Sequence, residues 1–219
     1  MTYRVRLMRR EDVAQVAEID REAFPTQWPP PNFQHELRNR MAHYIVAYDE
    51  EKLVEQPTAK ASSANSLTRL ASRLRQLFGH DLSSSDKPSP PIENYITGFV
   101  GFWVMADEAH ITSIAVREAY RRRGIGELLL LAAMDWAMEL KTRIVTLEVR
   151  ASNTAAQNLY LRYGFTRVGV RRGYYTDNRE DALVMSTEDI SSAAFQRRFR
   201  QLRRALAQKL GIAGYQIAR

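Results

Sequence analysis

The fold of this chain is decided by a stretch that begins Ile111-Thr112-Ser113-Ile114-Ala115-Val116 and continues, after four residues, as Arg121-Arg122-Arg123-Gly124-Ile125-Gly126. The β-branched residues of the first part predict a strand, because such side chains pack well on a pleated sheet. Beyond the glycines, apolar residues recur at the spacing of a helix with one buried face. These residues are Ile125, Leu128, Leu129, Ala132, Ala133, Trp136, Ala137 and Leu140.

The turn between this strand and this helix has the composition of an anion-binding site. Gly124 and Gly126 let backbone N–H groups approach a ligand closely, and a helix N-terminus carries unpaired donors with partial positive charge. Arg121, Arg122 and Arg123 stand at the same corner. The spacing lacks the third glycine of a dinucleotide site and the Gly-Lys-Ser/Thr ending of a P-loop. We therefore predict a pyrophosphate site, the alternative being an ordinary basic turn before a core helix.

The composition is that of a globular protein without disulfides. The 219 residues suit one domain with elaborations. No run approaches the roughly 18 apolar residues of a membrane span, and the first residues lack the apolar core of a signal peptide. Cysteine is absent and the four histidines show no paired ligand spacing, so we expect neither a thiolate nucleophile nor a metal site. These features favour the cytoplasm.

Hydrophobic periodicity along the chain predicts an α/β fold, with a mixed sheet covered by helices. Prolines at 25 and 29–31 end the first helix, because proline lacks an N–H donor and disfavours a helical residue before it. The predicted strands span 3–8, 43–48, 95–105, 111–116, 143–150, 165–175 and 181–185, and the predicted helices span 10–24, 32–39, 125–140 and 153–163.

Two parts of the chain fall outside this predicted core. A hairpin loop normally takes about 2–5 residues, so we interpret residues 53–94, rich in Ser, Pro, Lys and Asp, as a partly disordered insertion. Helical spacing predicts a short amphipathic helix within it at 67–78. Residues 191–219 hold seven cationic side chains and no carboxylate, so the charge of this segment equals the whole net charge of +7. We therefore predict a domain over residues 1–190 and a basic amphipathic helix after it.

The basic C-terminal segment has an apolar stripe opposite its arginines. A helix of this kind packs its stripe on its own domain or on a second subunit, or it contacts an anionic partner such as ribosomal RNA or a membrane surface. These interpretations stay open at this point, as does the oligomeric state. The stripe consists of Phe195, Phe199, Leu202, Leu206 and Leu210.

Several short strings resemble one family of enzymes. They are Leu147-Glu148-Val149-Arg150-Ala151-Ser152-Asn153, Tyr163-Gly164-Phe165, Arg171-Arg172-Gly173-Tyr174-Tyr175 and Glu180-Asp181-Ala182-Leu183-Val184-Met185. Together with the turn at 121–126 they resemble the GNAT acetyltransferases, and among them the group (RimI type) that acetylates the N-terminal alanine of a small-subunit ribosomal protein. The resemblance covers residues 95–187 well and residues 3–48 loosely. It implies the GNAT fold, whose central sheet is mixed and mostly antiparallel and is flanked by helices, and acetyl-CoA as cosubstrate.

The resemblance also implies which residues would hold the acetyl-CoA. The turn would bind its pyrophosphate, and a strand backbone would pair with its pantetheine arm, where one main-chain N–H would polarise the thioester carbonyl. An asparagine would hydrogen-bond the same arm or simply cap its helix. The residues are Arg121, Arg122, Arg123, Gly124, Ile125 and Gly126 in the turn, Ile114, Ala115 and Val116 in the strand, and Asn153.

Two side chains fit the chemistry of acetyl transfer, which needs a deprotonated amine and a protonated leaving thiolate. Glu148 stands in an otherwise apolar strand, where a carboxylate is costly unless it lines a wet cavity, so it suits a general base; alternatively it faces solvent. Tyr160 resembles the family's general acid beside the thioester sulfur, or it is a core aromatic. Tyr174 and Tyr175 resemble the family's substrate-side aromatics, or they pack across strands.

We therefore expect a protein N-terminal acetyltransferase of the ribosomal-alanine type. Transfer would be direct, in a ternary complex, because cysteine is absent and no covalent acyl carrier suggests itself. A GNAT enzyme that acts on lysine side chains or on a small amine is the second interpretation. The third is a binding module that keeps the fold without the activity, against which the presence of both Glu148 and Tyr160 argues.

Overall fold

The computed structural model describes residues 2–26, 29–55 and 92–211. The chain divides into two compact units, Met1–Lys52 with Asn94–Arg219, and Leu53–Glu93. The predicted disordered insertion, with its helix at 67–78, lies outside the described residues except for the ends of two strands. All the predicted site residues, and the predicted C-terminal helix, belong to the first unit.

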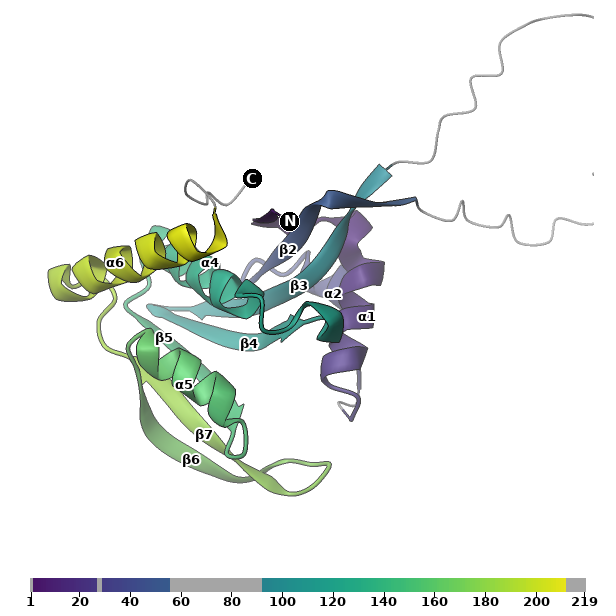
Figure 1. Ribbon diagram of the computed structural model, residues 1–219. Coiled ribbons are helices and arrows are strands. Elements are labelled where there is room, and N and C mark those ends of the chain that lie inside the picture. Colours follow the sequence, from purple (N-terminus) through teal and green to yellow (C-terminus); the bar gives the residue numbers. More distant parts are fainter. Residues whose placement is uncertain (1, 27–28, 56–91, 212–219) are drawn as a thin grey trace, which may run out of the picture. The chain divides into compact units, whose positions relative to one another are not determined.

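The first unit is built on a seven-stranded sheet with the strand order β1-β2-β3-β4-β5-β7-β6 (Figure 1). Pairing is parallel between β4 and β5, and antiparallel in the pairs β1–β2, β3–β4, β5–β7 and β6–β7. The predicted mixed, mostly antiparallel sheet is thereby confirmed. The strands are β1 (Tyr3–Leu7), β2 (Ala42–Glu55), β3 (Ile92–Met105), β4 (Glu108–Val116), β5 (Ile144–Arg150), β6 (Phe165–Tyr175) and β7 (Glu180–Thr187).

Three of the helices, α2, α5 and α6, begin where the sequence offers a capping side chain. Asn32, Asn153 and Ser192 each accept a hydrogen bond from the backbone N–H three residues later, which satisfies one of the donors left free at a helix start. The helices are α1 (Val13–Ala23), preceded by a 3₁₀ turn (Arg10–Asp12), α2 (Phe33–Glu36), α4 (Ile125–Glu139), preceded by a 3₁₀ turn (Glu118–Tyr120), α5 (Thr154–Arg162) and α6 (Ala193–Leu210).

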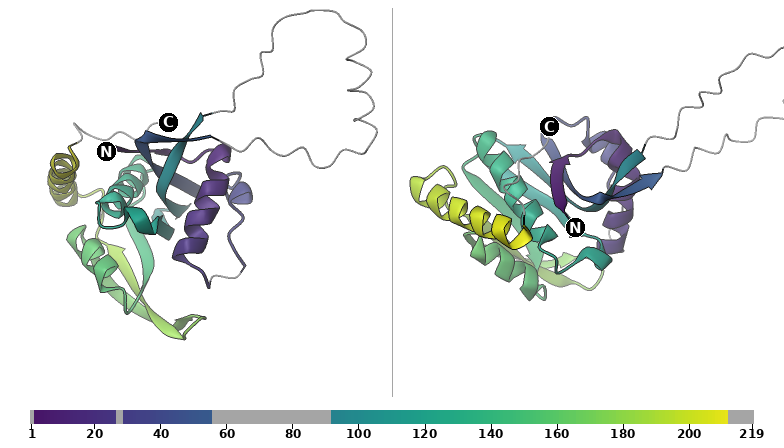
Figure 2. Two further views of the ribbon diagram at one scale, coloured as in Figure 1. Left: turned by 45° about the vertical axis from the view of Figure 1, so that its right-hand side comes forward. Right: turned by 45° about the horizontal axis from the view of Figure 1, so that its top comes forward.

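Helices cover both faces of the sheet. Along β2, Ile45 and Ala47 belong to one buried cluster with residues of α4, whereas Tyr44 and Val46 belong to another with residues of α1. This alternation follows from the two-residue period of a strand. Figure 2 shows α1 and α4 on opposite sides of the sheet.

Helix α4 is buried on more than the one face that its apolar spacing predicted. Leu130, Leu131 and Met134 lie off the predicted face, yet none of them is exposed to solvent. The reason is a further helix, α6, which lies across α4 (Figure 1) and places Phe195, Phe199 and Leu206 in the same cluster. The basic helix therefore packs its apolar stripe on its own domain.

Candidate active site

The parallel ladder between β4 and β5 ends part-way along both strands. The paired residues run from Glu108↔Ile144 to Ile111↔Leu147. Immediately after Ile111 the register of β4 against β3 shifts, so that Thr112 is an extra residue in β4. Such a bulge increases the local twist of a strand, and this accounts for the loss of pairing. Beyond the bulge, β4 and β5 are no longer paired, with residues 114–116 on β4 and Glu148 on β5.

The glycine turn lies next to the end of β4. Gly124 has φ +85° and directly precedes α4, whose first backbone bond runs from Leu128 N–H to Gly124 C=O at 2.9 Å. The N–H groups of residues 125–127 precede that bond and are the free donors of a helix start. A Cβ on Gly126 would lie 3.8 Å from Val116 Cγ2. The structure thus brings the predicted pyrophosphate turn and the predicted pantetheine strand together. Binding of acetyl-CoA by these residues stays a prediction.

The three arginines of the turn have different surroundings. Arg123 contacts the preceding 3₁₀ turn, because its guanidinium donates to Ala119 C=O at 2.8 Å and stacks over the ring of Tyr120. Arg121 donates to Val116 C=O at 3.3 Å, and Arg122 has φ +64°. All three are exposed residues. Their common role in pyrophosphate binding stays a prediction.

Glu148 is an enclosed carboxylate at the point where the strands separate. Its side chain is only 8% exposed, so the alternative of a solvent-facing residue does not hold. Oε2 lies 3.1 Å from Nε2 of His110 on β4, and Oε1 lies 2.9 Å from Nη2 of Arg171 on β6. Side chains from three different strands therefore meet at this carboxylate.

His110 belongs to a longer chain of polar contacts. Its Nδ1 lies 2.9 Å from Oγ1 of Thr146, and the hydroxyl of Thr146 donates a hydrogen bond to Glu108. The sequence reasoning missed both His110 and Arg171. The sequence does carry a pattern that includes His110. Glu108 and His110 alternate with apolar residues in β4, and Thr146 and Glu148 alternate with apolar residues in β5. Only the register of the two strands, however, shows that these polar side chains are neighbours.

Tyr160 of α5 is 5% exposed, and its ring packs 5.7 Å from that of Phe165. Burial raises the pKa of Tyr160 above its ordinary value, so the hydroxyl stays protonated at neutral pH and can act only as a proton donor. Among the described residues, none accepts a hydrogen bond from it. Tyr160 is thus as buried as a core aromatic residue, and its hydroxyl has no acceptor among the described residues. Its role as general acid stays a prediction.

Asn153 caps α5, as one of its two interpretations predicted. Its Oδ1 accepts a hydrogen bond of 3.1 Å from Ala156 N–H. Gln157 in the next turn donates to the carbonyls of Arg150 and Ala151, at 3.0 and 2.9 Å. These bonds fix the connection from β5 to α5, and contact of Asn153 with acetyl-CoA stays a prediction.

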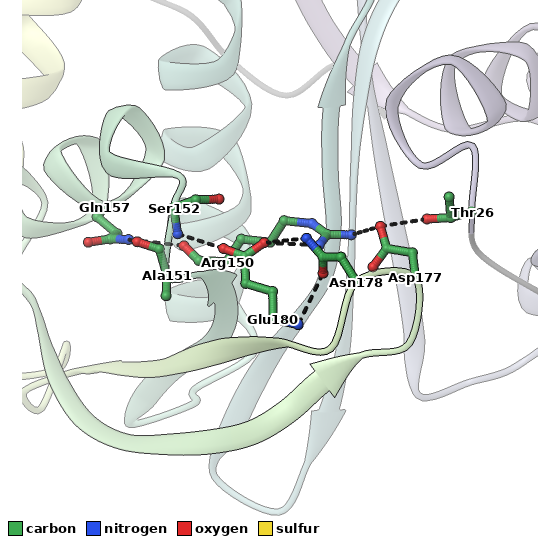
Figure 3. A network of polar contacts seen from close by, with 8 residues as sticks. All are labelled: Thr26, Arg150, Ala151, Ser152, Gln157, Asp177, Asn178 and Glu180. Atoms are coloured by element: carbon green, nitrogen blue, oxygen red, sulfur yellow. Dashed lines mark hydrogen bonds and ion pairs between the residues drawn. The ribbon is translucent and has the colours of Figure 1, made fainter.

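The end of β5 is tied to the β6–β7 turn by the polar network drawn in Figure 3. Arg150 forms ion pairs with Asp177 at 2.8 Å and with Glu180 at 3.1 Å. Hydrogen bonds from Ser152, at 2.7 Å for its N–H, lower the pKa of Glu180 to about 2. The Thr26 hydroxyl, in the segment after α1, donates to Asp177 at 3.1 Å.

The two tyrosines at the end of β6 form an edge-to-face pair, with ring centroids 5.2 Å apart. Tyr175 lies under Arg150, whose guanidinium carbon is 3.9 Å from the ring centre, and burial raises its pKa to about 12. Tyr174 is 44% exposed. Tyr175 therefore packs against the network, and Tyr174 is the more available surface for a peptide.

Two other kinds of site are absent from the described residues. No cluster of three or more histidine, acidic or cysteine side chains in the described ranges has the arrangement of a metal site. No helix in the part of the chain that the structure describes is long and apolar enough to cross a bilayer.

Comparison with known proteins gives matches along most of the chain. Residues 84–165 match the model of the Acetyltransferase (GNAT) family. The chain is 34% identical over 182 residues (83% of this chain, 92% of the other) to a Bacillus subtilis protein provisionally named a [ribosomal protein bS18]-alanine N-acetyltransferase. It is also 34% identical over 185 residues (84% and 92%) to an N-alpha-acetyltransferase of Sulfurisphaera tokodaii.

The fold is shared with solved structures as well. The crystal structure of the ribosomal-protein-S18-alanine N-acetyltransferase from Escherichia coli superposes with a TM-score of 0.59 and 24% identity, over 86% of this chain and 94% of that one. Similarity at this level of identity shows the fold, and it agrees with the strand order and helix placement described above.

Proposed function

The chain belongs to the GNAT family of acetyltransferases, and from this premise we propose that it acetylates the N-terminal α-amine of a protein. The substrate that fits best is a small-subunit ribosomal protein that begins with alanine, because relatives that match along most of the chain are named for that reaction or for N-alpha-acetylation. Acetyl-CoA, the cosubstrate of this family, would supply the acetyl thioester.

One observation carries this proposal. The carboxylate of Glu148 lies where β4 and β5 separate, and two contacts hold its oxygens, one to His110 and one to Arg171. A carboxylate in that place can receive a proton from an amine that approaches from the side of the β6–β7 turn. The fixed contacts restrict it to one orientation, which is what a general base needs.

The nature of the amine fits this base. An α-amine has a pKa of about 7.7–8.0, whereas a lysine side chain has a pKa of about 10.4. An α-ammonium therefore gives up its proton much more readily at neutral pH, and a carboxylate-centred base suffices. Glu148 would take this proton, and the free amine would attack the thioester carbonyl.

The other groups of the site would stabilise the reacting carbonyl and the leaving thiolate. Backbone N–H groups of Ile114, Ala115 and Val116 lie beyond the end of the pairing between β4 and β5, and one of them would donate to the developing oxyanion. Tyr160 would donate its hydroxyl proton to the departing thiolate as the general acid. Tyr174 and Tyr175 would border the peptide.

The test is a comparison of amines with one enzyme preparation. Acetyl-CoA turnover is measured on peptides that begin with alanine, serine or methionine, and on an N-terminally blocked peptide with one lysine. Glu148→Gln is measured beside the wild type, and Glu188→Gln serves as a control of equal chemistry at an exposed residue.

We expect the alanine peptide to be the best substrate. Glu148→Gln should lower kcat by about 10²–10⁴-fold, the usual worth of acid–base catalysis, with unchanged affinity for acetyl-CoA. Glu188→Gln should behave as the wild type. Equal rates on all N-termini, or a preference for lysine, would contradict the proposed substrate, and full activity of Glu148→Gln would contradict the proposed base.

A further inference from the structure

The cationic side chains of α6 fall into two sets. One set contacts α4 and α5 of the same domain, and it consists of Arg198 (2.9 Å to Arg162 C=O), Arg203 (3.4 Å to Asp135) and Lys209 (3.9 Å to Glu127). The other set, Arg197, Arg200 and Arg204, is exposed, and no carboxylate among the described residues pairs with it. Half of these cations are therefore used in holding the helix to its domain, and half are not.

The second set forms a single row along the outer face of α6. The spacing of three and four residues places Arg197, Arg200 and Arg204 within about 60° of arc on an α-helix and spreads them over about 10 Å of its axis. Phe199 and Leu206 lie on the other side of the helix and are each only 3% exposed, because they pack with α4. Figure 2 shows α6 outside α4, on the side of the sheet away from α1. The packing of α6 thus directs this arginine row outward.

The buried apolar side of α6 limits the kind of partner that the arginine row can bind. A helix that enters a membrane interface buries its apolar face among lipids, whereas Phe195, Phe199 and Leu206 are already buried in the domain. The centre of a protein interface is rich in apolar side chains, but none of the exposed large hydrophobic residues in the described ranges belongs to α6. A second copy of the same face would bring like charges together. The partner is therefore recognised by its negative charge.

The arginine row has the chemistry of a phosphate-binding surface. A planar guanidinium can donate two parallel hydrogen bonds to one phosphate group. Because a nucleic-acid double helix repeats such groups closely along its axis, a row about 10 Å long faces several of them. The aromatic side chains of α6, Phe195 and Phe199, are buried, so an unpaired base would find none to stack on. These features favour the backbone of a double helix over a single strand.

We propose that Arg197, Arg200 and Arg204 form a docking surface for the phosphate backbone of double-helical RNA. The choice of RNA rests on the proposed function, because a ribosomal protein has RNA as its surroundings. Contacts to phosphates position a protein on RNA without reading the base sequence. Docking through the arginine row would therefore raise the concentration of the enzyme near its substrate, whatever the sequence of the RNA.

The first test measures the binding of a short, labelled RNA duplex by fluorescence anisotropy, without peptide or acetyl-CoA. The wild type is compared with a variant that combines Arg197→Gln, Arg200→Gln and Arg204→Gln. We expect this variant to bind about 10–100-fold more weakly at about 50 mM salt. The slope of log K against log salt should become shallower by about 2–3, because each phosphate contact contributes about 0.9 to it.

A matched control removes three positive charges elsewhere. Arg10, Arg38 and Arg40 are exposed as well, and their combined replacement by glutamine should leave RNA binding as in the wild type. Both variants should keep the stability of the wild type, since neither set of substitutions touches the apolar core. Equal weakening in both variants would mean that only the net charge matters and would overturn the proposal. Unchanged binding in the variant of the arginine row would overturn it as well.

Further measurements separate RNA from other anionic partners. With vesicles that contain phosphatidylserine, we expect weaker binding than with RNA at the same salt concentration, and stronger binding would overturn the assignment to RNA. Ultraviolet crosslinking in cells should attach RNA to the wild type and much less to the variant of the arginine row; DNA in place of RNA would overturn it too.

The outcome for the docking surface is independent of the outcome for the proposed function. If the wild type acetylates no peptide, the proposed function fails, while the anisotropy data still decide whether the arginine row binds RNA. If the wild type acetylates the alanine peptide but binds no RNA, only the docking surface is overturned. Acetylation of the free peptide should be the same in the wild type and in the variant of the arginine row.

Discussion

Nη2 of Arg150 lies 2.8 Å from Oδ2 of Asp177, and this ion pair joins the end of the strand that carries Glu148 to the β6–β7 turn. The same carboxylate accepts a hydrogen bond from Thr26, so the segment after α1 is held to that turn as well. Hydrogen bonds from Arg150 to Asp177 lower the pKa of this carboxyl, which therefore stays charged at neutral pH. Arg150 thus links the proposed base to the border of the proposed peptide site.

The first prediction concerns this arginine. Arg150→Lys keeps the positive charge but loses the planar group that reaches Asp177 and Glu180 together and stacks over Tyr175. We expect the KM for the peptide to rise by about 10-fold, the size of one lost charged hydrogen bond, with unchanged acetyl-CoA affinity. Steady-state kinetics with each substrate varied separately provide the measurement.

A matched control is available at Arg143. It also forms a 2.8 Å ion pair, with Asp189, and that pair is made outside the network of Figure 3. Arg143→Lys should leave both KM values unchanged. If Arg150→Lys raises the KM for acetyl-CoA instead, the network supports the cosubstrate side, and our placement of the peptide is wrong.

The second prediction separates catalysis from packing at two tyrosines. Tyr160→Phe keeps the buried ring and removes a hydroxyl with no described acceptor, so stability should change by less than about 1 kcal/mol while kcat falls by about 10²-fold. Tyr163→Phe removes a hydroxyl that donates to Glu127 at 2.8 Å, so it should cost about 1–2 kcal/mol of stability and leave kcat unchanged. Urea denaturation and initial rates measure the two effects, and a parallel loss of both properties in each variant would remove Tyr160 from the mechanism.

Local signals in the sequence predicted the elements and part of the site. The caps Asn32 and Asn153, and the glycine pair 124 and 126, act within a few residues of themselves, so their positions follow from the sequence alone. The contact of His110 with Glu148 depends instead on the parallel register of β4 and β5, which no local pattern states.

For the same reason, packing between distant segments could not be predicted from the sequence. Periodicity predicted a single buried face for α4, whereas α6 covers it from outside and brings Leu210 to the glycine turn. The partners of two neighbouring carboxylates, Glu180 and Asp181, also lie in distant segments of the chain. In the structure Glu180 binds Arg150 and Asp181 accepts from Gly173 N–H at 2.8 Å, so both stabilise the β6–β7 hairpin.

The third prediction distinguishes the two glycines of the turn. Gly124 has φ +85°, and a Cβ there would lie 3.0 Å from Leu210 Cδ2, so Gly124→Ala should cost about 1 kcal/mol or more of stability. A Cβ on Gly126 would make only an ordinary contact with Val116, so Gly126→Ala should be as stable as the wild type. Calorimetric titration with CoA should nevertheless show weaker binding for Gly126→Ala, because a methyl group would stand where a phosphate approaches the backbone. Unchanged CoA affinity in both variants would contradict the assignment of the turn.

The fourth prediction concerns a buried carboxyl outside the site. Asp20 of α1 is 3% exposed, and among the described residues its Oδ1 has no hydrogen-bond partner. Burial raises the pKa of Asp20 to about 6. Because this folded-state pKa lies above the unfolded value of about 3.9, the folded form binds its proton more tightly. Ionisation of Asp20 therefore costs no stability well below pH 4, and its cost grows as the pH rises through about 6.

Asp20→Asn removes this pH dependence, since an amide does not ionise. The difference in unfolding free energy between Asp20→Asn and the wild type should shift in favour of the variant by about 2 kcal/mol from pH 4 to pH 7.5. Urea denaturation at several pH values measures this difference directly. Its change with pH is the informative quantity, because any fixed cost of burying an amide cancels. A difference that stays constant with pH would mean that Asp20 reaches solvent or a partner in the folded protein.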